Sequence, residues 1–206
     1  SDYGQVEDFK GKLTTALAAQ TYRFADDIVA VSRGVAKSVV QNTPVSTEGT
    51  TVLHNPVDIE DVQATAKEDP GHEWLTNPTL ETVVSVGRLR KQKDVATLLR
   101  AIATLRETRP EVRLIVVGKG PKREQLESLA ASLGIRDSVS FEGYVENPYA
   151  YMLSSSVFAL SSRYEGLPTV LIEALACGSS IVSTDCPHGP QEVLVDGEYG
   201  WLTPVG

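Results

Sequence analysis

Short apolar runs alternate with amphipathic stretches from residue 81 to residue 184. The runs rich in β-branched residues have the length and composition of buried strands and cover 81–87, 112–118, 138–143, 157–161 and 180–184. The stretches between them carry apolar residues at helical spacing and cover 94–110, 122–134, 147–154 and 168–177. Because parallel neighbours need crossover connections, this alternation predicts an α/β fold, a doubly wound parallel sheet with helices on both faces. Such sheets bind ligands beyond the carboxyl ends of their strands.

The first 57 residues follow another pattern. We expect an amphipathic helix at about 5–24, then a strand in "DDIVAVS", a helix in "RGVAKSVV" and a second strand in "TVLHNPVD". These elements either extend the same sheet or belong to a neighbouring domain. The segment 58–80, which contains "KEDPGHEW", is typical of a solvated connection. The predicted domain boundaries are therefore 1–57, the connection 58–80 and a ligand-binding domain at 81–206.

Composition narrows the classes of partner. The 206-residue chain is 41% hydrophobic, which is enough for a large buried core. Its 27 acidic residues against 19 Lys and Arg give a net charge of −8, which argues against nucleic acid or an anionic membrane as the main partner. Cys177 and Cys186 match no disulfide framework or paired metal motif, so we expect buried thiols in a reducing compartment. His54, His72 and His188 lack ligand spacing, and no Asp-x-Asp occurs, so the sequence gives a metal site no support.

The stretch "YEGLPTVLIEALACG" predicts an apolar helix with one carboxylate in its middle, Glu173. An ionised carboxylate among apolar neighbours is costly unless a polar group meets it. That group is either part of a bound ligand or a buried arginine that forms a structural ion pair. A second carboxylate, Glu165, precedes the helix. Eight residues of helix span about 12 Å, so the two acids are not expected to grip one atom, and they suit opposite ends of an elongated ligand.

The start of the same helix predicts an anion site. Pro168 suits the first helical position because its missing N–H would have no partner there. The amides of Leu167, Thr169 and Val170 would then point outward with the helix dipole behind them. An ordinary loop-to-helix junction without a ligand explains the same features.

A second segment, "GRLRKQK", places four cations at the end of the first predicted strand: Arg88, Arg90, Lys91 and Lys93. Cations beside a helix N-terminus oppose its dipole, so they need either full solvation or a shared anion. Arg88 and Lys93 are the best candidates for the anion. If both segments face one crevice, that anion is a diphosphate held by side-chain cations and backbone amides.

Four segments in register, "GRLRKQK", "GKGPKREQLESLA", "FEGYVENPYAYM" and "EGLPTVLIE", resemble the donor-binding half of a retaining glycosyltransferase. The family is glycosyltransferase family four, the glycosyl transferases group 1, with the GT-B fold and Rossmann-like domains. The resemblance covers 81–206 and reaches back through "ADDIVAVSRGVAKSVV" and "TVLHNPVD". It implies that 1–57 is the remnant of an N-terminal acceptor-side domain with its linker, and that 81–206 is a donor domain truncated at its C-terminus.

The resemblance also implies residue roles. Arg88 and Lys93 would bind the donor diphosphate and stabilise its charge as the sugar leaves, and Glu165 would face the sugar hydroxyls as the third catalytic residue. Glu173 would accept hydrogen bonds from the ribose hydroxyls. The other expected donor-binding residues are Gly87, Gly118, Gly120, Gly143, Tyr144, Val145, Gly166, Leu167, Thr169 and Val170. His188, in a Gly-Pro-x-Glu loop, either lines the sugar pocket or faces solvent, and Lys119 and Arg163 are expected to be surface charges.

The function that follows from the resemblance is metal-independent, retaining transfer of a hexosyl group from a UDP- or GDP-sugar, in glycan or polysaccharide biosynthesis, without a cofactor. The acceptor would be a glycan, a lipid or a polyprenyl-linked sugar, bound through the missing N-terminal domain. The fragment alone would be inactive or weakly active, and its expected location is the cytoplasm, with the full protein free to attach to the inner membrane face. A nucleotide-sugar epimerase or a phosphorylase of the same architecture, and a non-catalytic nucleotide-binding module, remain as alternatives.

Overall fold

The computed structural model of the chain describes residues 21–43, 45 and 49–206. Most of the helix expected at about 5–24 lies outside these residues. Within them, Tyr22–Phe24 forms a single 3₁₀ turn. None of the described helices is long and apolar enough to cross a bilayer.

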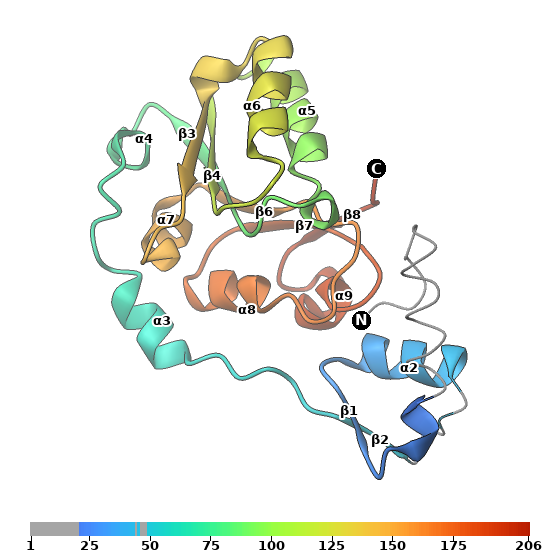
Figure 1. Cartoon of the computed structure of the whole chain (residues 1–206). Helices are drawn as coiled ribbons and strands as arrows, with labels where there is room; N and C mark the ends of the chain where they lie inside the picture. The colour runs from blue at the N-terminus through green and yellow to red at the C-terminus, as the bar shows by residue number, and fades with distance from the viewer. Residues whose placement is uncertain (1–20, 44, 46–48) are drawn as a thin grey trace.

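The main sheet has six parallel strands in the order β5-β4-β3-β6-β7-β8 (Figure 1). The strands are β3 (Glu81–Val86), β4 (Val112–Val117), β5 (Val139–Gly143), β6 (Val157–Leu160), β7 (Ile181–Thr184) and β8 (Trp201–Thr203). The five predicted strands are confirmed. The prediction missed β8, because an edge strand of three residues whose Trp201 is 78% exposed has no apolar run to reveal it.

The strand order places a topological switch point between β3 and β6. The chain moves outward from β3 through β4 to β5, then returns to pair β6 with the other side of β3. The loops after β3 and β6 therefore leave the same end of the sheet in opposite directions and open a crevice between them. This crevice is the expected place for a ligand.

Helices cover both faces of the sheet, as predicted (Figure 1). The helices that follow β3 are α5 (Val95–Arg106), α6 (Arg123–Ser132), α7 (Pro148–Ser154), α8 (Thr169–Ala176) and α9 (Pro190–Val193). Helix α5 buries Val95, Leu98, Leu99 and Ile102, whose spacing puts them on one stripe. That stripe packs with α6 and the sheet in one core, whereas residues of α7, α8 and α9 pack in a second core.

The N-terminal elements form a small unit of their own. Strands β1 (Ile28–Ala30) and β2 (Thr50–Val52) pair in a separate parallel sheet, with α2 (Arg33–Asn42) between them in sequence. Ser32 caps α2, because its hydroxyl accepts a hydrogen bond from the Val35 amide at 3.1 Å. The described strands of this segment therefore do not extend the main sheet.

The segment 58–80 is more ordered than the sequence predicts. It forms α3 (Ile59–Thr65), which Asp58 caps, and α4 (Glu73–Thr76). Val62 and Ala66 are each only 2% exposed and join the core of α7 and α8. The expectation of a solvated connection is therefore wrong at α3. Two small apolar residues one turn apart among charged neighbours are too weak a signal to predict a helix.

Candidate functional site

A cavity of about 440 Å³ lies at the carboxyl ends of β3, β4 and β5. The predicted donor-binding residues that line it follow all three strands and are Gly87, Arg88, Gly118, Gly120, Tyr144 and Val145. Lys119 also lines it, and its ammonium lies 5.6 Å from the centre of the Tyr144 ring. Lys119 is thus part of the cavity rim, although the sequence assigned it to the general surface. Residues far apart in sequence meet here because parallel strands end at one edge of the sheet.

Gly118 and Gly120 allow the loops after β3 and β4 to pack backbone against backbone. A Cβ at Gly118 would approach the carbonyl oxygen of Gly87 closer than 3.0 Å, and one at Gly120 would do the same at Leu89. Gly118 also has a φ of 135°, outside the range that side chains tolerate. Gly143 does not line the cavity, but its carbonyl accepts a hydrogen bond from the Gly118 amide at 2.6 Å. These glycines therefore shape the cavity through close packing.

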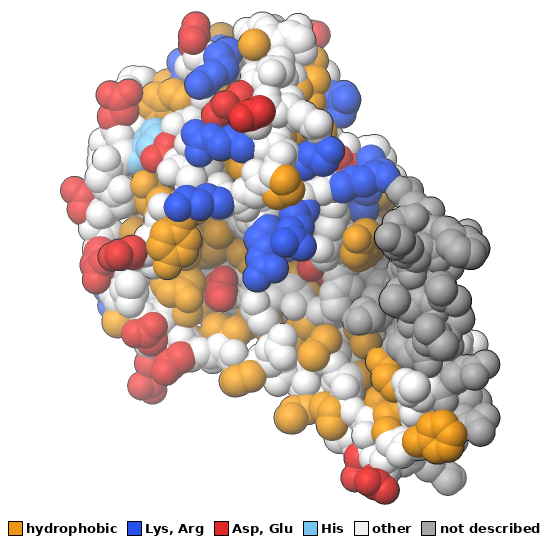
Figure 2. Space-filling view, viewed as in Figure 1, with side chains coloured by type: hydrophobic (Ala, Val, Ile, Leu, Met, Phe, Trp, Pro, Cys, Tyr) orange, Lys and Arg blue, Asp and Glu red, His pale blue; other side chains and the backbone are white. Residues whose placement is uncertain are grey.

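The cations of the cavity are Arg88, Arg90 and Lys119. Figure 2 shows Lys and Arg side chains gathered over one face of a molecule whose net charge is −8. Among residues 21–43, 45 and 49–206, no group of His, Cys, Asp and Glu is arranged to hold a metal ion. At this edge of the sheet, side-chain cations are the charges that the protein offers to an anion.

Lys93 and Glu165 form a direct ion pair. The Lys93 ammonium lies 2.6 Å from Oε1 of Glu165, and the same oxygen accepts a hydrogen bond from the Ser162 hydroxyl at 2.6 Å. Glu165 is 8% exposed, so its charge is largely removed from water. The sequence placed Lys93 and Glu165 on different parts of a ligand. In the structure they contact each other, and a donor would have to share Lys93 with Glu165.

Glu173 lies on α8 and is partly buried. Burial raises the pKa of Glu173, while the positive charge of Lys93 acts in the opposite direction. The described residues give Glu173 no Arg or Lys partner within ion-pair distance, so the predicted alternative of a structural pair with arginine is not found there. Lys93 therefore lies within electrostatic reach of both predicted acids. Cys177 and Cys186 are buried free thiols, as expected.

Replacing Glu173 with glutamine should raise the melting temperature near neutral pH. Because the pKa of Glu173 is raised by folding, its ionised form destabilises the folded state. The gain should shrink as the pH falls through that pKa, and vanish below the ordinary value of 4.5. Thermal unfolding across this pH range checks the result, with Glu146→Gln at an exposed loop position as the control. A lower melting temperature at neutral pH would mean that the Glu173 carboxylate has a stabilising partner.

The turn before α8 differs from the prediction. Pro168 occupies the N-cap, so the helix begins at Thr169, and the Thr169 amide donates to the Leu167 carbonyl at 2.9 Å. Thr169 therefore cannot offer an outward amide to an anion in this conformation, because the tight turn has already used it. No described residue accepts a hydrogen bond from the amides of Leu167 or Val170. The Gly166 carbonyl accepts a hydrogen bond from Ser32, which joins this turn to the N-terminal unit.

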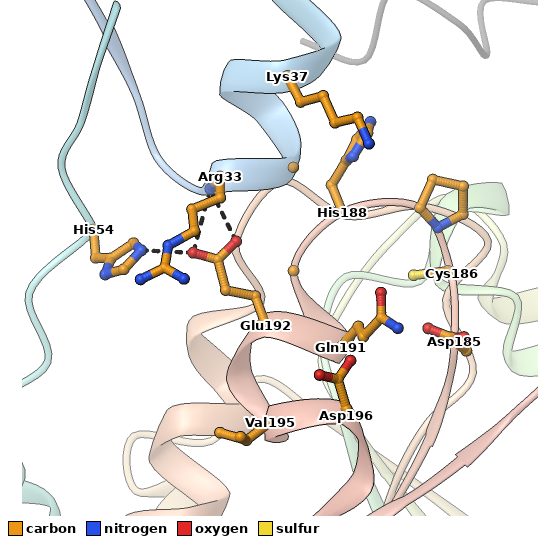
Figure 3. A pocket seen from close by; sticks show the side chains of 13 residues that line it. Arg33, Lys37, His54, Asp185, Cys186, His188, Gln191, Glu192, Val195 and Asp196 are labelled. Atoms are coloured by element: carbon orange, nitrogen blue, oxygen red, sulfur yellow. Dashed lines mark hydrogen bonds and ion pairs between the residues drawn. The ribbon is translucent and has the colours of Figure 1, made fainter.

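A second cavity, of about 760 Å³, lies between α2 and the segment after β7 (Figure 3). Glu192 of α9 accepts hydrogen bonds from the Arg33 amide at 2.9 and 3.2 Å, and its Oε1 lies 2.8 Å from Nε2 of His54. His188 lines this cavity with a φ of 64° and packs against Gly34. His188 is thus half-buried at this cavity and does not line the cavity at the ends of β3, β4 and β5. Glu192 belongs to the Gly-Pro-x-Glu loop, but no contact of its carboxylate was predicted from the sequence.

Curated proteins of similar sequence are glycosyltransferases. The chain is 34% identical over 198 residues to an N-acetylgalactosamine-N,N'-diacetylbacillosaminyl-diphospho-undecaprenol 4-alpha-N-acetylgalactosaminyltransferase of Campylobacter jejuni, across 96% of this chain and 52% of the relative. A lipopolysaccharide 1,6-galactosyltransferase of Salmonella typhimurium is 27% identical across 91% of this chain and 51% of its own length. The chain thus spans about half the length of these curated relatives.

Solved structures resemble the fold as well. The crystal structure of Anabaena HepE in complex with UDP and glucose matches with a TM-score of 0.81 and 25% identity, over 94% of this chain and 54% of that protein. The family model described as Glycosyl transferases group 1 matches residues 69–206. The resemblance seen in the sequence is therefore confirmed, and the structural neighbours are GT-B glycosyltransferases. This chain belongs to the glycosyl transferases group 1 family.

Proposed function

We propose that this chain is the donor-binding part of a glycosyltransferase that moves a hexosyl group from a UDP- or GDP-sugar to an acceptor, with retention of configuration and without a metal ion. The observation that carries the proposal is the 440 Å³ cavity at the carboxyl ends of β3, β4 and β5, because predicted donor residues from three separate loops line it. Family membership and the UDP complex of a neighbour support it.

The proposed donor lies across the carboxyl edge of the sheet. Its base occupies the cavity beside Gly118, Tyr144 and Val145, in reach of backbone groups. Its diphosphate lies between Arg88 and Lys93, and its ribose hydroxyls donate to Glu173. Fixed cations of this kind stabilise the charge that grows on the leaving diphosphate, where they lower the barrier most.

The sugar end of the donor faces Glu165 in this proposal. Glu165 uses Oε1 for Lys93 and Ser162, whereas Oε2 contacts, among the described residues, only the Gln92 amide group at 3.4 Å. A carboxylate oxygen accepts more than one hydrogen bond, so Oε2 retains capacity for a sugar hydroxyl. The amides of Leu167 and Val170 supply further donors beside it.

The acceptor is proposed to be a glycan, a lipid or a polyprenyl-linked sugar, in line with the lipid-linked substrate in the name of the Campylobacter relative. We infer that it binds mainly through sequence that the relatives have beyond the length of this chain. Orienting acceptor against donor provides much of the acceleration in group transfer, so this chain alone should bind donor and transfer little. A cytoplasmic location, at or near the inner membrane face, fits a nucleotide-sugar donor.

Titration calorimetry with UDP tests the proposal. The chain should bind UDP saturably, and Arg88→Ala should weaken binding at least about tenfold, because a charge-assisted contact to phosphate is lost. Arg100→Ala, which alters an exposed position on α5, is the matched control and should leave binding unchanged. A folded chain that saturates with neither UDP nor GDP would count against the proposed function.

A further inference from the structure

The loops after β3 and β6 are joined by hydrogen bonds beside the ion pair of Lys93 and Glu165. The Arg163 amide donates to the Gln92 carbonyl at 2.8 Å, and the Ser161 hydroxyl donates to the Lys93 carbonyl at 2.8 Å. The loops can meet because β3 and β6 are neighbours in the sheet. The backbone on both sides of the ion pair is therefore fixed by the opposite loop.

Two side chains complete this connection. Gln92 donates from its amide group to the Tyr164 carbonyl at 2.9 Å and reaches Oε2 of Glu165 at 3.4 Å. The Arg163 guanidinium donates from Nε to Oδ2 of Asp94 at 2.8 Å. Gln92 thus holds the Glu165 side of the ion pair, and Arg163 holds the residue that follows Lys93. We call Gln92, Asp94 and Arg163 the loop bracket.

Asp94 is held in an unfavourable backbone conformation. Its φ and ψ are both 44°, in the left-handed region that residues with a Cβ avoid. The residue is 9% exposed, and its carboxylate accepts hydrogen bonds from Arg163 and from the Thr97 hydroxyl. Glycine would adopt this backbone at lower cost, but it could not bind Arg163. Local strain of this kind persists where surrounding contacts impose it, and such sites are often functional.

We propose that the loop bracket positions Lys93 and Glu165 for the donor, with Lys93 aimed at the diphosphate and Oε2 of Glu165 at the sugar. The inference rests on the proposed function and extends it to three residues outside the predicted site. The sequence predicted a surface charge at Arg163 and gave Gln92 and Asp94 no role. Their contribution comes through the placement of other side chains, so they are positioning residues.

A loop bracket that only stabilised the fold would affect nucleotide affinities differently from a loop bracket that positions Lys93. Loss of stability affects every ligand of the folded chain alike, whereas a misplaced Lys93 affects only ligands with the phosphate that it contacts. UDP and UMP share the base, the ribose and one phosphate, and they differ in the second phosphate. The ratio of their affinities therefore reports the position of the cation independently of stability.

The test measures UDP and UMP affinities by calorimetry, together with melting temperatures, for the unaltered chain, Asp94→Gly, Arg163→Met and Arg163→Lys. For Asp94→Gly we expect a melting temperature close to that of the unaltered chain, because relief of the left-handed strain offsets the lost ion pair. Its preference for UDP over UMP should fall about tenfold, with UMP affinity nearly unchanged. Arg163→Met should lose the same preference, and Arg163→Lys should recover part of it.

The control is Arg100→Met, which removes an exposed cation of α5. If the bracket variants keep the UDP preference of the unaltered chain, or lose UDP and UMP affinity equally, the positioning role is wrong and the proposed function stands. If the unaltered chain binds none of UDP, UMP and GDP, both the proposed function and the role of the bracket are overturned.

Discussion

Replacing Gly118 with alanine should destabilise the protein by about 2–4 kcal/mol and abolish UDP binding. The new Cβ would lie closer than 3.0 Å to the Gly87 carbonyl oxygen, and the φ of 135° would be strained as well. The Gly87 carbonyl is backbone and cannot swing away as the end of a flexible side chain can. The loops after β3 and β4 would therefore have to separate. Urea unfolding measures the loss of stability.

Gly134→Ala is the matched control for Gly118→Ala. Gly134 also has a left-handed φ, of 71°, but no atom lies within 4 Å of a Cβ built there. This variant should lose only about 1 kcal/mol, the cost of the backbone conformation alone. Equal losses in the two variants would show that the close packing of the loops after β3 and β4 contributes nothing.

Replacing Lys93 with methionine should cost about 2–3 kcal/mol of stability, because it leaves the Glu165 carboxylate buried without its cation. The pair is close, at 2.6 Å, and Glu165 is only 8% exposed. The same change should weaken UDP binding at least about tenfold, since the proposed diphosphate loses one of its two side-chain cations. Urea unfolding and calorimetry measure the two effects separately.

The double variant Lys93→Met with Glu165→Gln separates stability from binding. A neutral glutamine still accepts a hydrogen bond from Ser162, so most of the stability should return. UDP binding should stay weak, because no cation has been restored. Recovery of UDP binding in the double variant would remove Lys93 from the donor site.

The alternating pattern of strands and helices was sufficient to predict the doubly wound fold. The prediction succeeds because each of β3 to β7 is a short apolar run between turn residues. Both the length of the run and the spacing of its apolar residues then indicate a strand. The pattern failed at α3 and β8. These elements have few apolar residues, and contacts with elements distant in the sequence hold them in place. In those cases tertiary packing, and not the local pattern, determines the structure.

The sequence predicted several residues that line the cavity, but it did not predict which side chains contact one another beside it. Arg88, Tyr144 and Val145 were found because they follow predicted strands in segments that resemble a family. The Arg163 contact with Asp94 and the Lys93 contact with Glu165 join residues 69 and 72 positions apart. Such pairs depend on β3 lying beside β6, and the pattern along the chain does not encode this strand order.

A crystal structure of the chain with UDP bound tests the central claim most directly. We predict that the uracil ring occupies the cavity beside Gly118, Tyr144 and Val145. The diphosphate should lie about 3 Å from the nitrogen atoms of Arg88 and Lys93, with the ribose at Glu173. UDP bound in the cavity beside α2, or with its diphosphate turned away from both cations, would contradict the account.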